Sequence, residues 1–208
     1  IKRYKGSLQR FSIPERINGL PVTKIDDYTF AFYECANFIS IKIPSSVSAI
    51  GNHAFQNCVN LSDINIPPSV RSIGNSAFRD CKSLAAVEIP SSVQKMGDNV
   101  FFGCSSLAAI RIPPLISRIG NCAFEGCKNL VSAEIPDSVS SIGDGAFYDC
   151  RSLQAIKIPT SVREIGGSAF ANCVSLTEAE IPSSVSEIRG FTFAGCSSLK
   201  SVKIPASV

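Results

Sequence analysis

The sequence predicts a repeat solenoid built mostly of β-strands, and three observations support this fold class. A 23-residue unit, IPPSVRSIGNSAFRDCKSLAAVE at residues 66–88, recurs along the chain. A fixed period of about 20 to 50 residues is typical of solenoids, propellers and related arrays. Each copy contains a short apolar–polar alternation that ends at a proline, as a β-strand does. Hydrophobic residues make up 45% of the chain and charged residues only 18%, which suits a long core.

The copies divide the chain into one continuous array. We expect a single solenoid over residues 1–208, with a cap-like segment at 1–19, an irregular repeat at 20–42, seven regular repeats at 43–203 and the start of a further repeat at 204–208. Each coil of a solenoid contacts only its neighbours, so stacking of coils supplies the core. The whole array therefore counts as one domain.

The first part of each copy is expected to be a strand. In the unit that begins at Ile66, Val87 and Ile89 alternate with Glu88, which is the period of a half-buried strand. Pro90 lacks a backbone N–H and ends the strand. The strand's partners are the same positions one coil away. One strand per repeat then forms a parallel, in-register sheet.

The rest of each copy predicts a second, shorter parallel strand and a tight turn. Ser69 to Gly74 is a short extended piece that ends at glycine. Phe78 and Cys81 lie three residues apart, so one turn of 3-10 or α-helix would point both inward. Equivalent phenylalanines are expected to form one buried aromatic column, and they are Phe55, Phe78, Phe101, Phe124, Phe147, Phe170 and Phe193.

Eight of the nine cysteines follow the same 23-residue period. Equivalent atoms in stacked coils lie about 4.8 Å apart, while disulfides prefer Cβ atoms about 3.5–4.5 Å apart. We therefore expect reduced, buried thiols, and Cys122, which is out of register, as the one accessible thiol. A zinc site is the alternative, but it requires clustered thiolates and usually a histidine. The periodic cysteines are Cys35, Cys58, Cys81, Cys104, Cys127, Cys150, Cys173 and Cys196.

Composition and charge exclude several classes of protein. No run of 18 apolar residues exists to span a membrane, and the first residues, IKRYKGSLQR, do not form a signal peptide. We expect the chain to be a fragment or a mature form. The net charge is only +3, although basic residues are concentrated in residues 1–24. That end is expected to be a solvated surface rather than an anion-binding one. Nucleic-acid binding would need a basic stripe, and none is seen.

Catalytic chemistry is not expected. The only histidine, His53, has no acid or nucleophile singled out beside it, although catalytic triads need oriented partners. The glycines follow the repeat period and do not form a phosphate-binding loop. The sequence therefore predicts no enzyme activity, no cofactor and no metal.

Residues 61–81, LSDINIPPSVRSIGNSAFRDC, carry the pattern Leu-x-x-Ile-x-Ile-Pro-x-x-Val-x-x-Ile-Gly-x-x-Ala-Phe-x-x-Cys. This pattern resembles the BspA-like, or treponemal, class of leucine-rich repeats, over about residues 13–208. The resemblance implies a right-handed leucine-rich-repeat coil with a strand-lined concave face. Members are largely bacterial or protist surface proteins associated with adhesion. The resemblance thus implies an extracellular, cell-surface or periplasmic location, and it supplies no catalytic residues.

Positions that vary between copies point to the surface. The position between the two inward strand residues alternates in sign from Glu88 to Lys203, which favours a ladder of cross-strand ion pairs over a recognition stripe. Small residues in the middle copies predict either a shallow apolar patch on the same face or a means of letting the strands curve. The residues expected to contact a partner are Asp63, Asn65, Ala86, Glu88, Ala109, Arg111, Val131, Glu134, Lys157 and Glu180.

Other departures from the repeat suggest further sites. Phe102, Leu115 and Tyr148 are large apolar residues at expected surface positions and could form an apolar patch. Ala133 and Ala179 replace a larger residue of the inner strand column and could leave a pocket.

Three functional hypotheses follow. The first is a non-enzymatic adhesion or protein-interaction module whose partner is a host or extracellular matrix protein. The second is a structural or self-associating solenoid. The third is a binder of a small apolar ligand near Ala133 or Ala179.

Overall fold

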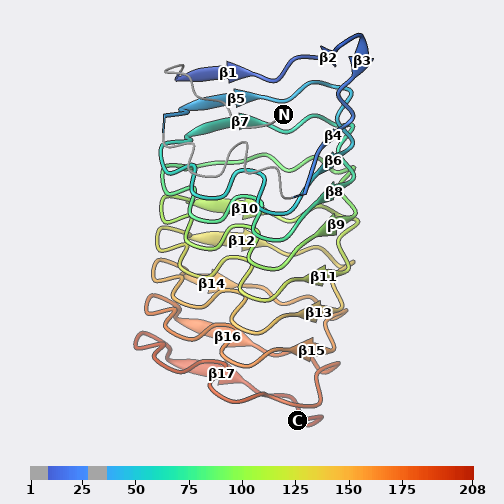
Figure 1. Ribbon diagram of the computed structural model, residues 1–208. Coiled ribbons are helices and arrows are strands. Elements are labelled where there is room, and N and C mark those ends of the chain that lie inside the picture. Colours follow the sequence, from blue (N-terminus) through green and yellow to red (C-terminus); the bar gives the residue numbers. More distant parts are fainter. Residues whose placement is uncertain (1–8, 28–36) are drawn as a thin grey trace.

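A computed structural model describes residues 9–27 and 37–208 as one stack of coils (Figure 1). Colours run from blue at one end of the stack to red at the other, so successive repeats lie side by side. The described residues form β-strands and turns, with no helix. The predicted β-solenoid is confirmed.

The longer strands form one face, which we call the long-strand face. Equivalent residues pair in parallel one coil apart, as Ile41 pairs with Ile64 and Ile110 with Ala133. The sheet is not continuous, because its strands pair in the three groups β1-β5-β7, β10-β12 and β14-β16-β17. Its strands are β1 (Arg10–Ser12), β5 (Ser40–Lys42), β7 (Asp63–Asn65), β10 (Ala109–Arg111), β12 (Ser132–Glu134), β14 (Ala155–Ile156), β16 (Glu178–Glu180) and β17 (Ser201–Lys203).

The predicted second set of strands forms a short-strand face across the core. It pairs in parallel in the two groups β4-β6-β8-β9 and β11-β13-β15. A separate antiparallel pair, β2 (Arg16–Ile17) and β3 (Leu20–Pro21), lies near the N-terminal end. The strands of the short-strand face are β4 (Lys24–Ile25), β6 (Ala49–Ile50), β8 (Ser72–Ile73), β9 (Lys95–Met96), β11 (Arg118–Ile119), β13 (Ser141–Ile142) and β15 (Glu164–Ile165).

The third side of each coil consists of turns, and the expected 3-10 turn is not confirmed. Alternate backbone N–H groups donate to the next coil, as Ser76 N does to Asp98 O at 2.9 Å and Phe78 N to Val100 O at 2.9 Å. An N–H group that donates a hydrogen bond to the next coil cannot also donate one of the hydrogen bonds of a helix within its own coil. Isolated turn bonds remain, such as Cys81 N to Phe78 O at 3.2 Å. Phe78 and Cys81 still point inward, and both are fully buried.

The aromatic column is confirmed. From Phe55 to Phe193, successive rings stack with centroids 5.2–5.7 Å apart and ring planes within 15° of each other. The rings of all but the last, Phe193, are fully buried. Stacking in register therefore aligns side chains as well as strands.

The cysteine column is confirmed in part. Free buried thiols donate to the phenylalanine carbonyl of the preceding coil, as Cys81 Sγ does to Phe55 O at 3.2 Å. The expectation that all eight are reduced is wrong, because Cys58 is disulfide-bonded. Cys35 lies outside the described residues. Cys58 belongs to the first regular copy, so one of its neighbours is the irregular repeat, where an argument from identical coils does not apply.

The glycine that follows every short strand except β4 is required by close packing between coils. A Cβ built on Gly74 would lie 2.5 Å from Asn52 N and 2.7 Å from Gly51 C. Equivalent clashes, with a nearest atom at 2.4–2.7 Å, occur at Gly51, Gly97, Gly120, Gly143 and Gly166. In the next copy Arg189 occupies this position, and there the short-strand pairing ends at β15.

Candidate functional site

The long-strand face holds all ten residues that the sequence assigns to partner binding, and all ten are exposed. Most lie on strands or next to one, as Arg111 does on β10 and Glu134 on β12. Ala86 and Glu88 lie in a coil that forms no strand on this face. Residues 86–88 make no backbone hydrogen bond to either neighbouring coil in the described part of the chain. The face is thus interrupted at this coil.

The column of alternating charges is paired only in part. Arg111 Nε lies 2.6 Å from Glu134 Oε2, and Lys203 Nζ lies 3.6 Å from Glu180 Oε2. All four side chains are at least 67% exposed, so solvent screening leaves each pair little stabilising effect. The pairing with Glu134 raises the pKa of Arg111 above its ordinary value. A continuous ladder of ion pairs is not formed.

Three charges of this column form no ion pair with any described residue. Glu88 is unpaired because the nearest base, Arg111, turns to Glu134. Lys157 is unpaired because its two acidic neighbours, Glu134 and Glu180, hold other partners. Lys42 is the third, and its neighbour in the next coil is the neutral Asn65. These charges are available to a partner without breaking an existing contact.

Two grooves open where the long strands end. The first, of about 640 Å³, lies beside the interrupted coil. Its walls are apolar, from Val87, Ile89 and Ile112 among others, and it carries the charged side chains of Glu88, Arg111 and Glu134. Since Arg111 and Glu134 neutralise each other, the groove has one uncompensated negative charge.

The second groove, of about 410 Å³, lies three coils further along. It contains the Glu180–Lys203 pair together with Lys157 and the acidic Glu178. Ala179, where the sequence suggests a pocket, forms part of its wall, and only 5% of that residue is exposed. Among the charge-column residues in this groove, Lys157 is the one without an ion-pair partner.

The three residues of the expected apolar patch have different surroundings. Leu115 is 52% exposed, whereas Phe102 and Tyr148 are half-buried. The guanidinium of Arg79 covers the Phe102 ring at 4.2 Å from its centroid. The Tyr148 hydroxyl accepts a hydrogen bond from Asn172 Nδ2 at 3.1 Å. Of these three residues, only Leu115 presents a large exposed apolar surface.

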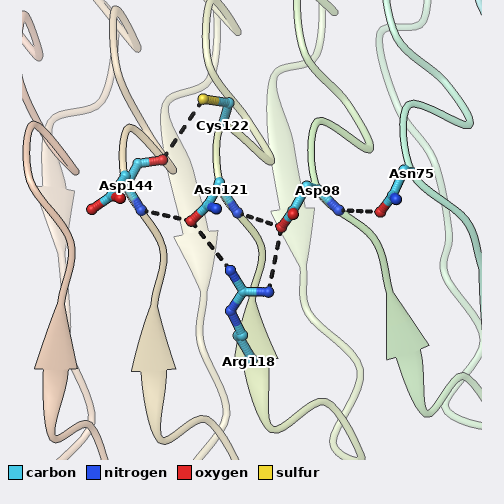
Figure 2. Close-up of polar contacts among 6 residues, drawn as sticks. All are labelled: Asn75, Asp98, Arg118, Asn121, Cys122 and Asp144. Carbon is cyan, nitrogen blue, oxygen red and sulfur yellow. Dashed lines mark hydrogen bonds and ion pairs between the residues drawn. The ribbon is translucent and has the colours of Figure 1, made fainter.

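The short-strand face has a polar ladder that the sequence analysis missed (Figure 2). The side-chain Oδ1 of Asn75 accepts a hydrogen bond from Asp98 N, and Asp98 Oδ1 accepts one from Asn121 N, both at 2.8 Å. Asparagine or aspartate directly after the glycine in five successive copies was the available signal. Six such links of 2.7–3.0 Å join the acceptors Asp27, Asn52, Asn75, Asp98, Asn121 and Asp144 to the backbone of the next coil.

The step between β9 and β11 is a seam in the short-strand face. Neither Ser117 N nor Gly120 N donates to a backbone carbonyl in the described chain, although the equivalent amides one coil later do. Lys95 and Arg118 occupy equivalent positions on the two strands, where like charges repel. Figure 2 shows Arg118 bridging the seam instead, with Nη1 3.4 Å from Asp98 Oδ1 and Nη2 3.2 Å from Asn121 Oδ1.

A third groove, of about 520 Å³, runs over this seam and the ladder. It contains Lys24, Lys95 and Arg118, but Lys24 pairs with Asp26 at 3.0 Å and Arg118 with Asp98. The ladder atoms at its base already hold the coils together. The polar groups of this groove are mostly committed to the fold.

Several thiols have raised pKa values, and the histidine contacts a glutamine. Burial raises the pKa of Cys127 and Cys173 to about 12. Burial, with Glu125 nearby, also raises the pKa of Cys122 to about 12, so its thiol is neutral at physiological pH. Cys122 is also not the one accessible thiol, because Cys196 is half-buried as well. His53 Nδ1 lies 2.5 Å from Gln56 Oε1.

The described residues contain no candidate metal cluster and no membrane-spanning helix. No group of three or more histidine, cysteine or acidic side chains among them could hold a metal ion. No helix among them is long and apolar enough to cross a membrane.

Coils of 23 residues with one parallel strand on each of two faces and a phenylalanine core define a leucine-rich repeat solenoid. The sequence matches the BspA type leucine-rich repeat region, in six copies, over residues 3–131 and 117–208. The chain belongs to this family. Proteins with such repeats are generally non-enzymatic interaction or adhesion modules.

Solved structures show the same architecture. A leucine-rich repeat protein of T. pallidum is 37% identical, with a TM-score of 0.79, over 84% of this chain and 81% of its own. A leucine-rich cell surface protein of Faecalibacterium prausnitzii is 24% identical, with a TM-score of 0.66, over 100% of this chain and 84% of its own. The pneumococcal vaccine antigen PcpA is 23% identical, with a TM-score of 0.54, over 89% of this chain and 55% of its own. No curated protein sequence matches the chain.

Proposed function

We propose that this solenoid is an adhesion module that binds a partner protein through its long-strand face at the cell surface. The observation that carries the proposal is the combination of exposed small residues, unpaired charges and two grooves on that face. On the opposite face, the ladder residues and Arg118 already hold partners within the fold. Family membership supports an interaction role. The cell-surface protein of F. prausnitzii with the same fold is consistent with this location.

A panel of immobilised extracellular matrix proteins tests this proposal. Binding of the purified chain is compared with that of the double variant Arg111→Glu/Lys157→Glu. The control is Lys95→Glu/Arg163→Glu, which makes the same change in net charge on the short-strand face. We expect the first variant to lose most binding and the control to keep it, with both retaining the native circular dichroism spectrum. Equal binding by both variants would place the contact elsewhere and refute the role of the long-strand face.

A further inference from the structure

The uncompensated charges on the long-strand face have a fixed geometry. The charge column divides into an unpaired Glu88, the Arg111–Glu134 pair, an unpaired Lys157 and the Glu180–Lys203 pair. Each of the two grooves thus holds one ion pair and one unpaired group of this column. The unpaired groups have opposite signs. From Glu88 to Lys157, the unpaired charges of the column therefore change sign from negative to positive.

The distance between the two groups follows from the coil spacing. Glu88 and Lys157 occupy equivalent positions three coils apart, and at about 4.8 Å per coil their backbones are separated by about 14 Å. An extended polypeptide advances about 3.3 Å per residue, so about four residues span this distance. A chain lying along the stack would meet one charge in each groove.

The grooves add apolar surface next to each charge. Val87, Ile89 and Ile112 line the groove that holds Glu88, and Ile156 and Ile158 line the groove that holds Lys157. A lysine or arginine has an apolar stem that can pack on such walls while its charged end reaches a carboxylate. A partner charge of opposite sign gains an attractive contact, and one of like sign is repelled.

We propose that the long-strand face binds an extended segment of a partner protein that places a basic residue at Glu88 and an acidic residue about four positions away at Lys157. This inference rests on the proposed function and specifies the partner's charge order. It assigns recognition to the unpaired Glu88 and Lys157 rather than to the Arg111–Glu134 ion pair between them. The short-strand face offers an internal comparison, because Lys95 and Glu164 are also exposed, of opposite sign and three coils apart.

Selection from a random library of 12-residue peptides displayed on phage tests the proposal. The library is selected against the wild-type chain, against Glu88→Lys/Lys157→Glu, and against the control Lys95→Glu/Glu164→Lys. Both double variants keep the net charge of the wild type. We expect wild-type and control selections to enrich a basic and an acidic residue about four positions apart in one order, and the first variant to enrich the reverse order. Synthetic peptides from the wild-type pool should bind each single reversal about two- to fivefold more weakly.

The outcomes separate this inference from the function on which it rests. Peptides that compete with a matrix protein for the long-strand face, yet show no charge pair and no response to the reversal, would overturn the charge-pair inference and leave the proposed function standing. Selections that enrich no binder of this face would overturn both. Reversal of the charge order in the first variant alone supports both.

Discussion

Gly74→Ala should weaken the fold much more than Gly190→Ala, although both changes add one methyl group. A Cβ on Gly74 would lie 2.5 Å from Asn52 N, a backbone atom of the preceding coil that cannot rotate away. Ordinary contact requires about 3.5 Å, so the coils must separate locally by about 1 Å. Gly190 has a negative φ, and a Cβ built on it would have no atom within 4 Å.

The magnitude follows from the bonds that this separation breaks. Gly74 N donates to Ile50 O at 2.8 Å, and Asn75 N donates to Asn52 Oδ1 at 2.7 Å. A shift of about 1 Å takes both beyond hydrogen-bonding distance, at about 0.5–1.5 kcal/mol each. Residual strain of about 1–3 kcal/mol adds to this. We expect a loss of about 2–6 kcal/mol for Gly74→Ala, and for Gly190→Ala no loss or a gain of up to about 1 kcal/mol.

Urea unfolding followed by far-ultraviolet circular dichroism measures the two changes side by side. The chain itself contains a precedent at Arg189, which occupies the glycine position. Its backbone N–H donates no hydrogen bond to a backbone carbonyl of the preceding coil. Equal stability of the two variants, within about 0.5 kcal/mol, would refute the claim that close packing of coils requires glycine.

Three further predictions concern the core, the thiols and the seam. Phe124→Ala should cost about 3–5 kcal/mol in urea unfolding, because its ring is fully buried in the aromatic column. Burial raises the pKa of Cys127 to about 12. The unfolded chain loses the Cys127 thiol proton near pH 8.5, while the native chain keeps it. The free energy of unfolding should therefore be constant below about pH 8 and fall as the pH rises from there towards 12. Urea midpoints that rise with pH in this range would contradict this. In hydrogen exchange followed by NMR, the Gly120 amide at the seam should exchange faster than Gly143, whose N–H donates to Ile119 O at 2.9 Å; equal protection would show that the seam is closed in solution.

Much of the fold could be predicted from the repeat because every coil places equivalent residues in equivalent surroundings. The inward positions of Phe78 and Cys81, the two sets of parallel strands and the exposure of Glu88 and Arg111 all follow from period and pattern. The helical turn was not confirmed, because its amides bond to the next coil instead. The residue pattern within one coil does not show which backbone hydrogen bonds link neighbouring coils.

The candidate site was predicted as a set of surface positions but not as an arrangement. The sequence shows that Arg111 has an acidic neighbour on each side, Glu88 and Glu134, but not which of them it contacts. That choice depends on side-chain reach and on the interruption of the sheet at residues 86–88. The surroundings of the predicted apolar patch are likewise an arrangement, since Arg79 and Asn172 contact two of its three members.

The sequence by itself determined the coil, its period, its core columns and its family, because each of these follows from the recurrence of residue types every 23 positions. Only the tertiary structure decided where the stack departs from its own symmetry. The disulfide at Cys58, the seam beside Arg118 and the unpaired charges at Glu88 and Lys157 are such departures. Their physical reason is the same. Contacts between coils depend on distances of a few tenths of an ångström and on which of two equivalent neighbours a side chain meets, and a repeat pattern treats those neighbours as identical.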